Sequence, residues 1–399
     1  MIHISKLYCG ADSPGDAVRY GRAGSADPSA APTAAERRPI VVWNITRKCN
    51  LRCLHCYTDS EAKNYPGELT TEQCKIVLKD LADFRVPAVL FSGGEPTLRP
   101  DLLELVAFAK SLGLRPTLST NGTLIDDTLA PKIAAAGFTY VGISLDGIGE
   151  VNDHFRGLPG AFDRAMAAFD RLTALGQRVG LRMTLTRHNV EHLDAIFDFL
   201  EAHRIPRACF YHLAYSGRGA ALAGQKMDLS PAETRAALDV ILRRTADLAR
   251  RNVPTEILTV DNHVDGVYLY RKLLEEDPAR AERTRKLLEW NGGGLYSSGV
   301  GIGCIDFLGH VHPDQFWMHY SFGNVLDRPF SRIWMDTCDP LMAGLKDKGS
   351  RIHGRCAAAA CRYFPLCGGS LRVRAERATG DPWAPDPGCY LTDEEIGLT

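Results

Sequence analysis

The sequence has no long apolar run, no long basic run and almost no net charge. No apolar stretch approaches the roughly 18 residues of a membrane span, and without a long basic run we expect no nucleic-acid partner. The start, MIHISKLYCG, lacks the charged-then-apolar pattern of a secretion signal. A chain of 399 residues, 45% hydrophobic, has room for one large domain and a smaller one, so we expect a globular cytoplasmic protein.

Cysteine, by contrast, is abundant: the chain has twelve, and without an export signal they indicate metal or redox use rather than disulfides. Cys49, Cys53 and Cys56 are spaced C-x3-C-x2-C. Three thiolates this close can hold three corners of a 4Fe–4S cluster, which leaves one iron free to bind and reduce a small molecule. A three-ligand zinc site or plain buried thiols are the alternatives, although zinc sites favour a second cysteine pair or a histidine further along.

From residue 39 the chain alternates between short apolar stretches and amphipathic ones. The apolar stretches predict six strands over residues 39–46, 86–92, 114–120, 138–147, 178–186 and 207–215. The segments after them predict helices over 69–84, 100–113, 128–137, 160–176, 192–203 and about 231–251, the first capped by Thr70 or Thr71. Six β–α units in a row predict an α/β protein with a parallel sheet and outer helices, and with its chemistry at the carboxyl ends of the strands.

Polar and glycine-containing motifs fall at those carboxyl ends. The cysteine loop follows the first strand, and the next three strands are followed by SGGEP, STNG and SLDG. Each motif alone is an ordinary turn signal. Their order along one predicted rim is hard to produce by chance, so we interpret them as parts of one site.

The motifs CNLRCLHC, SGGEP, STNG and SLDG resemble those of the radical SAM superfamily over about residues 39–220. The resemblance implies a partial (β/α)6 TIM-type barrel, with S-adenosylmethionine (SAM) chelating the free iron through its amino and carboxylate groups. The cluster would then reduce the sulfonium and release a 5′-deoxyadenosyl radical. The residues expected to contact SAM are Tyr57, Gly93, Gly94, Glu95, Ser119, Asn121, Ser144, Asp146 and Arg182.

These residue types suit the expected contacts. Gly93 and Gly94 let the backbone approach the methionyl amine, to which Glu95 can offer a carboxylate. The short polar residues suit the ribose hydroxyls, and Tyr57 flanks the last cysteine, where it can lie against the adenine. Glu95 has an alternative role as a helix cap, because Pro96 follows it at a first-turn position.

A second group of cysteines lies near the C-terminus. Cys356, Cys361, Cys367 and Cys389 are spaced C-x4-C-x5-C-x21-C, and four thiolates would close a cluster completely. The group resembles an auxiliary cluster site of SPASM/twitch extensions, in which two residues, not four, separate the first two cysteines. Cys304 matches a further ligand position, but two other expected cysteine positions hold Asp314 and Leu371. We therefore predict one auxiliary 4Fe–4S cluster, with Cys304 unused or an odd ligand.

The predicted organisation has four parts. They are an N-terminal arm and flexible linker over 1–38, the partial barrel over 39–255, a connecting helical segment over 256–303 and a cysteine-rich auxiliary-cluster domain over 304–399.

Stretches outside the barrel motifs, among them CFYHLAYSGRG, LTVDNHVDGVY, DQFWMHYSFGNV and GDPWAPDPGCYLTDEEI, resemble one tetrapyrrole-modifying family of radical SAM enzymes. The resemblance implies that two acetate side chains are removed from 12,18-didecarboxysiroheme to give iron-coproporphyrin III in the siroheme-dependent haem pathway. It also implies a low-potential electron donor such as a ferredoxin or flavodoxin. A sister family, which makes the haem precursor of dissimilatory nitrite reductase, stays open.

Such a substrate is large, flat and anionic, so its site needs aromatic walls and cations that pair with carboxylates. The candidate contacts are Arg182, Arg218, Tyr211, His212 and His312, where a histidine could ligate the substrate's iron. Each of them could equally be an ordinary surface or packing residue. A SPASM peptide maturase and a non-enzymatic electron carrier or zinc protein remain alternatives, although residues 1–38 are too short for the usual peptide-docking domain.

Overall fold

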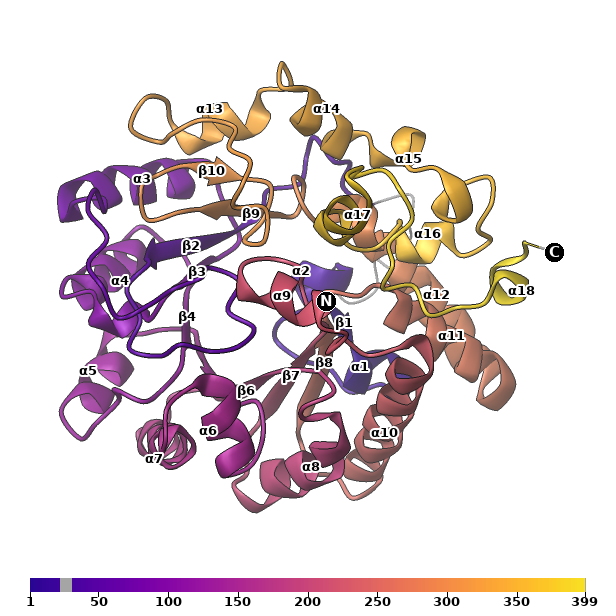
Figure 1. Ribbon diagram of the computed structural model, residues 1–399, viewed down its shortest axis with the longest axis horizontal. Helices are drawn as coiled ribbons and strands as arrows, with labels where there is room; N and C mark the ends of the chain where they lie inside the picture. Colours follow the sequence, from indigo (N-terminus) through magenta and orange to yellow (C-terminus); the bar gives the residue numbers. More distant parts are fainter. Residues whose placement is uncertain (22–30, 399) are drawn as a thin grey trace.

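The computed structural model describes residues 1–21 and 31–398 (Figure 1). The predicted arm and linker over 1–38 therefore lie partly outside the described residues. One mixed sheet of ten strands runs in the order β1-β8-β7-β6-β5-β4-β3-β2-β9-β10. Its parallel strands, each following its neighbour in sequence, are β2 (Ile40–Thr46), β3 (Val89–Gly93), β4 (Pro116–Thr120), β5 (Tyr140–Ser144), β6 (Val179–Thr184), β7 (Arg207–Tyr211) and β8 (Glu256–Val260).

The first six of these strands are the six predicted ones, and they form the predicted partial barrel. The sheet is curved and has helices on its outer side, as Figure 1 shows. Side chains alternate along β2: Trp43 and Ile45 pack into the main hydrophobic core, whereas Val42 lines the cavity on the other side. The alternation thus separates the core from the site.

The outer helices follow the strands as the periodicity predicts. They are α3 (Thr71–Asp83), α4 (Leu102–Ser111), α5 (Leu129–Ala136), α7 (Ala161–Ala174), α8 (Leu193–Ala202) and α10 (Pro231–Arg250). Thr70 caps α3, because its side chain accepts from the N–H of Gln73 while the Gln73 side chain bonds back to the Thr70 N–H. Ser230 and Glu233 form the same capping box at α10. Shorter helices, η2 (Pro96–Leu98), α6 (Glu150–Arg156), η3 (Val190–His192) and α9 (Arg218–Gly224), lie between strands and outer helices.

Both edges of the barrel are extended by further strands. At one edge β1 (Ile2–His3) pairs antiparallel with β8, and α1 (Ile4–Cys9) and α2 (Asp16–Tyr20) follow it. At the other, β9 (Ile302–Ile305) pairs parallel with β2 and antiparallel with β10 (Val311–His312). The segment 256–303, expected to be a helical connection, thus supplies β8 to the sheet and begins β9. The division of the chain into domains stays a prediction.

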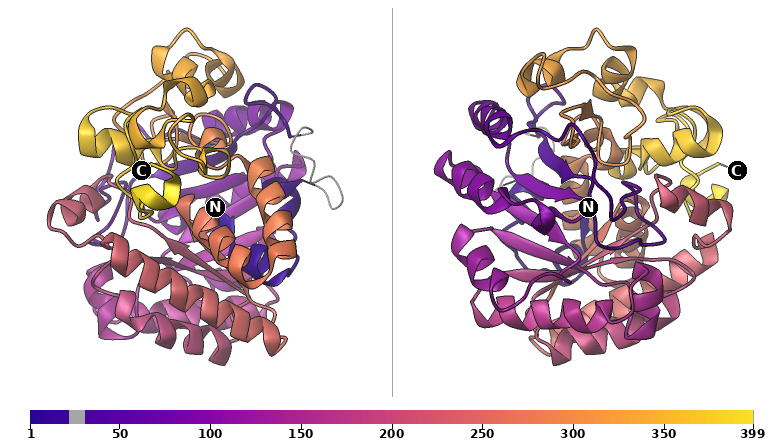
Figure 2. Two further views of the ribbon diagram at one scale, coloured as in Figure 1. Left: turned by 90° about the vertical axis from the view of Figure 1, so that its right-hand side faces the viewer. Right: turned by 60° about the vertical axis from the view of Figure 1, so that its left-hand side comes forward.

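The remaining helices lie along one side of the barrel, from β10 at one edge to α1 at the other (Figures 1 and 2). They are α11 (Val264–Glu276), α12 (Pro278–Asn291), η4 (Gly293–Tyr296), α13 (Phe330–Met335), α14 (Pro340–Lys346), α15 (Lys348–Arg351), η5 (Gly354–Cys356), α16 (Phe364–Cys367), α17 (Arg372–Thr379) and α18 (Asp393–Ile396). In the described part of the chain, no helix combines the length and the apolar character that a membrane crossing requires.

Candidate functional site

A cavity lies at the carboxyl ends of the parallel strands, as the topology predicts. Its free space, open mouth included, is about 1040 Å³. The predicted site residues that line it are Cys49, Cys53, Cys56, Tyr57, Gly93, Gly94, Ser119, Asn121, Ser144, Arg182, Tyr211 and His212. One rim therefore brings together twelve residues from the cysteine loop and five strand ends.

The cysteine loop is held in place by Arg218. Cys49 and Cys53 are buried and Cys56 is half-buried. Arg218 donates from Nε to the Cys53 carbonyl at 2.7 Å, and its backbone N–H donates to the Cys56 carbonyl at 2.9 Å. A further bond, 2.8 Å long, joins the Arg218 guanidinium to Asp59. Arg218 does not line the cavity, so its predicted role as a substrate contact is not supported: this guanidinium clamps the loop.

Gly93 and Gly94 allow two backbones to meet. A Cβ on Gly94 would stand 2.2 Å from the Lys48 carbonyl oxygen, and one on Gly93 would stand 2.2 Å from that of Thr46. Gly93 also has a φ of +124°, which favours glycine. The N–H of Gly94 donates to the Thr46 carbonyl at 2.8 Å. The pair thus fastens the end of β3 to the start of the cysteine loop.

Glu95 does not face the cavity. Its carboxylate caps η2 by accepting from the Thr97 N–H at 3.1 Å and the Thr97 hydroxyl at 2.7 Å. It also accepts from the Thr120 hydroxyl and the Asn121 N–H, both at 2.7 Å. The structure therefore gives Glu95 its alternative role as a helix cap, and through it Glu95 fixes the backbone at Asn121, which does line the cavity.

Asp146 is also buried behind the cavity wall. It accepts from the Thr184 N–H at 2.7 Å and forms an ion pair with Arg156. Arg156 lines the cavity and donates to Cys53 Sγ at 3.8 Å. Burial raises the pKa of the Cys53 thiol, and the guanidinium opposes that shift. Asp146 thus acts on the site through Arg156 and not by touching the cavity.

The remaining predicted SAM contacts all present polar groups at the rim. Tyr57 donates from its hydroxyl to Asn44 Oδ1 at 3.1 Å and hydrogen-bonds to Ser92 at 2.9 Å. The Asn121 amide donates to Asn50 at 2.9 Å. Ser119 and Ser144 are half-buried at the cavity wall. Their exposure leaves these short polar groups accessible to a ligand.

Three of the five candidate substrate contacts line the cavity. The Arg182 guanidinium lies 4.8 Å from the centre of the Tyr211 ring, and among the described residues no carboxylate forms an ion pair with it. His212 lies next to Tyr211 in sequence. His312 lies outside the cavity, where its Nδ1 hydrogen-bonds to the Tyr320 carbonyl at 2.7 Å. The structure therefore does not support His312 as a substrate contact.

The sequence interpretation missed Arg156, Asp261 and Gln315, which also line the cavity. Among the lining residues only Asp261 carries a carboxyl group, and burial raises its pKa to about 6. Asp261 also has a φ of +66°, unusual for a residue other than glycine. Asp261 could have been found as a polar residue at the carboxyl end of a strand, but β8 itself was not predicted.

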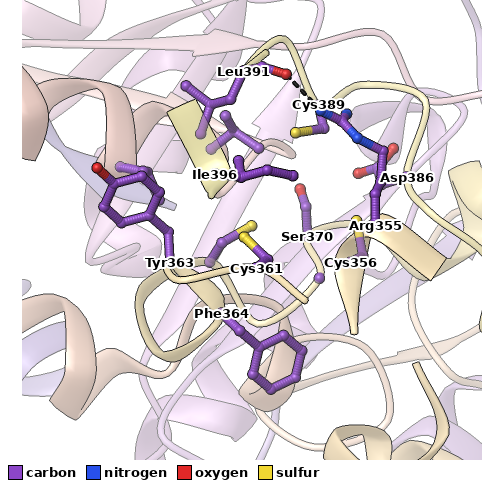
Figure 3. A pocket seen from close by; sticks show the side chains of 14 residues that line it. Arg355, Cys356, Cys361, Tyr363, Phe364, Ser370, Asp386, Cys389, Leu391 and Ile396 are labelled. Atoms are coloured by element: carbon purple, nitrogen blue, oxygen red, sulfur yellow. Dashed lines mark hydrogen bonds between the residues drawn. The ribbon is translucent and has the colours of Figure 1, made fainter. Parts of the chain in front are cut away.

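The four C-terminal cysteines line a second cavity of about 410 Å³. Figure 3 shows Cys356, Cys361 and Cys389 around it, with Arg355 donating to the Leu391 carbonyl at 2.7 Å. The four-alanine spacer forms a turn in which the Cys361 N–H donates to the Ala357 carbonyl at 3.0 Å. The longer spacing therefore still brings both cysteines to one cavity.

Cys304 lies apart from the second cavity. It is fully buried on β9, where the Asn44 amide donates to its sulfur at 3.6 Å. Of the two predicted roles, this position fits an unused thiol, which packs as a small apolar side chain.

The residues around the first cavity fit a cluster with a bound nucleoside. Cys49, Cys53 and Cys56 line the cavity and pack in one hydrophobic cluster. Two buried polar atoms of the wall, His55 Nδ1 and Gln315 Oε1, have no hydrogen-bond partner in the described part of the chain. Burial lowers the pKa of His55 to about 4, so the ring is neutral. A buried polar atom without a partner needs one, and a bound ligand or water can supply it.

The class of protein follows from this fold and site. Residues 43–200 match the radical SAM superfamily, and the chain belongs to it. Enzymes of this superfamily use SAM and a 4Fe–4S cluster, which Cys49, Cys53 and Cys56 can hold.

Particular relatives resemble the chain over most of its length. It is 53% identical to the Fe-coproporphyrin III synthase of Methanosarcina barkeri, over 100% of this chain and 99% of that one. It is 43% identical to the pre-heme d1 synthase of Dinoroseobacter shibae, over 90% and 88% of the two chains. Among solved structures, Streptococcus suis SuiB bound to S-adenosylmethionine has a TM-score of 0.67 at 18% identity, covering 87% of this chain and 76% of that one. The last likeness supports the fold alone.

Proposed function

We propose that this enzyme removes two acetate side chains from 12,18-didecarboxysiroheme and releases iron-coproporphyrin III, as a step of haem biosynthesis. The observation that carries the proposal is the 53% identity to a Fe-coproporphyrin III synthase along the full length of both chains. The cavity adds independent support, because it combines the cysteine loop with a cation and aromatic walls at one rim.

The chain's own residues place the reacting groups. Cys49, Cys53 and Cys56 would hold the cluster, which together with SAM supplies the 5′-deoxyadenosyl radical. Gly93 and Gly94 keep the cysteine loop close to β3, and Arg156 lies against Cys53. These contacts fix the loop before any ligand binds, so little ordering is needed on binding.

The substrate would lie against the wall formed by Tyr211 and Phe316. Both line the cavity, as does Arg182. A guanidinium without a carboxylate partner in the described residues is suited to a substrate carboxylate, which it can bind through two parallel hydrogen bonds. This arrangement supports an anionic, flat substrate.

Cys356, Cys361, Cys367 and Cys389 would hold one auxiliary 4Fe–4S cluster that carries electrons. A low-potential ferredoxin or flavodoxin would supply them. No disulfide joins any of the twelve cysteines, all of which lie within the described residues, which supports a reducing compartment such as the cytoplasm.

The test is anaerobic incubation of the reconstituted enzyme with SAM, a reductant and 12,18-didecarboxysiroheme, followed by mass spectrometry of the macrocycle. We expect the loss of two acetate side chains and the appearance of iron-coproporphyrin III. A macrocycle of unchanged mass would refute the proposal. Conversion to a different tetrapyrrole would favour the sister activity, which the 43% identity to a pre-heme d1 synthase keeps as the second candidate.

A further inference from the structure

Three buried, hydrogen-bonded side chains lead from the first cavity to the residue that follows Cys389. His212 Nε2 lies 2.8 Å from Asp265 Oδ2, and the Tyr390 hydroxyl donates to Asp265 Oδ1 at 2.9 Å. His212 follows β7 and lines the first cavity, Asp265 lies on α11, and Tyr390 follows Cys389 of the second. The three side chains come from distant parts of the chain, so their alignment is not a local turn.

The hydrogen bonds determine which nitrogen of His212 carries the hydrogen. A carboxylate only accepts hydrogen bonds, and both oxygens of Asp265 are engaged, one by Tyr390 and one by His212. Nε2 must therefore donate. In a neutral imidazole the other nitrogen, Nδ1, then carries a free lone pair, and no described residue hydrogen-bonds to it. The N–H of His212 donates to the Val260 carbonyl at 3.0 Å, which also fixes the backbone.

A neutral histidine with a carboxylate on its second nitrogen is a common form of metal ligand, because the carboxylate fixes the ring and raises its basicity. Among the residues lining the first cavity, only His55 and His212 are histidines. His55 lies within the cysteine loop and stacks on Phe155 with ring centres 4.6 Å apart. His212 instead follows the strand that ends in Tyr211, whose ring lies under Arg182.

We propose that His212 Nδ1 is an axial ligand to the iron of the tetrapyrrole, with Asp265 and Tyr390 as positioning residues. The proposal rests on the proposed function, because it requires an iron tetrapyrrole in the first cavity. Binding the iron would set the macrocycle at a fixed height above Tyr211. Arg182 would then be free to bind a peripheral carboxylate.

Iron-coproporphyrin III added to the reconstituted, SAM-free enzyme tests the ligand directly. The resonance Raman spectrum of the ferrous complex should contain an iron–imidazole stretching band. His212→Ala should lose the band and regain one when free imidazole is added. Asp265→Asn and Tyr390→Phe, which preserve side-chain shape, should shift the band in opposite directions. Asp265→Asn removes the carboxylate charge, so the band should fall in frequency and binding should weaken about tenfold or more. Tyr390→Phe removes a competing donor from the carboxylate, so the His212–Asp265 hydrogen bond strengthens and the band should rise in frequency.

His310→Ala is the matched control. His310 is also paired with a carboxylate, that of Asp306 at 3.2 Å, but it does not line the cavity. Its band and affinity should equal those of the wild type. Iron and sulfide content and the unfolding temperature of each variant check that it is folded, and the two shape-preserving variants carry the test if His212→Ala is not.

The outcomes separate the two proposals. A wild-type enzyme that converts its substrate but shows no iron–imidazole band, or a band that His212→Ala leaves unchanged, would overturn the ligand assignment alone. A wild-type enzyme that neither binds iron-coproporphyrin III nor converts the didecarboxysiroheme would overturn both.

Discussion

Replacing Gly94 by alanine tests how the site is assembled. The new Cβ would stand 2.2 Å from the Lys48 carbonyl oxygen and 2.7 Å from that of Arg47. Both atoms belong to backbone, which cannot rotate away as a side chain can. The backbone before Cys49 would have to retreat by roughly 1 Å, and overpacking of this kind costs about 1–3 kcal/mol.

The retreat would also disturb the hydrogen bond from the Glu95 N–H to the Lys48 carbonyl, now 2.8 Å long. We therefore expect Gly94→Ala to lower the free energy of unfolding by about 1–3 kcal/mol, to retain less iron and sulfide, and to release less 5′-deoxyadenosine. Gly224→Ala is the control, because a Cβ there meets nothing within 4 Å. Denaturant unfolding, iron analysis and chromatography measure the three effects. A Gly94→Ala variant indistinguishable from Gly224→Ala would refute this account of the glycine pair.

Three further predictions concern the auxiliary site, the buried cap and the N-terminal arm. Cys361→Ala should still release 5′-deoxyadenosine but lose product and about one cluster's iron; full product formation would show that the auxiliary site carries no needed electrons. In Glu95→Gln an amide N–H₂ would face buried hydrogen-bond donors, so the free energy of unfolding in urea should fall by about 1–3 kcal/mol. An unchanged unfolding midpoint would contradict the role of Glu95 as a helix cap. Tyr20→Phe leaves the buried N–H of His3, now 3.0 Å from the Tyr20 hydroxyl, without an acceptor. It should lower the free energy of unfolding by a similar amount. Tyr8→Phe, which loses only a surface bond to Glu276, should cost less than half as much.

The strands, the outer helices and the cysteine groups could be predicted because their signals are local. β-branched and apolar runs identified six strands. The expected N-cap at Thr70 or Thr71 placed the start of α3, and the structure shows that Thr70 is the cap. β8 was missed because EILTV is a short apolar run between helices, and only pairing with β7 makes it a strand. Because β8 was not predicted, Asp261 at its carboxyl end was not recognised as a site residue.

The roles of single polar residues could not be predicted, because they depend on partners far away in the sequence. Arg218 binds the cysteine loop more than 150 residues earlier in the chain, and no spacing rule connects the two. A glutamate at position 95 could either bind SAM or cap a helix. Its burial and its four hydrogen bonds show that it caps η2. Geometry, not residue type, separates such alternatives.

The central claim is that three cysteines leave one iron of a cluster open for SAM. Electron paramagnetic resonance of the anaerobically reconstituted, reduced enzyme tests it most directly, with spectra taken before and after SAM is added. We predict that the signal of one cluster changes its g-values on addition of SAM and that Cys53→Ala lacks this signal. Spectra that SAM leaves unchanged would contradict the account.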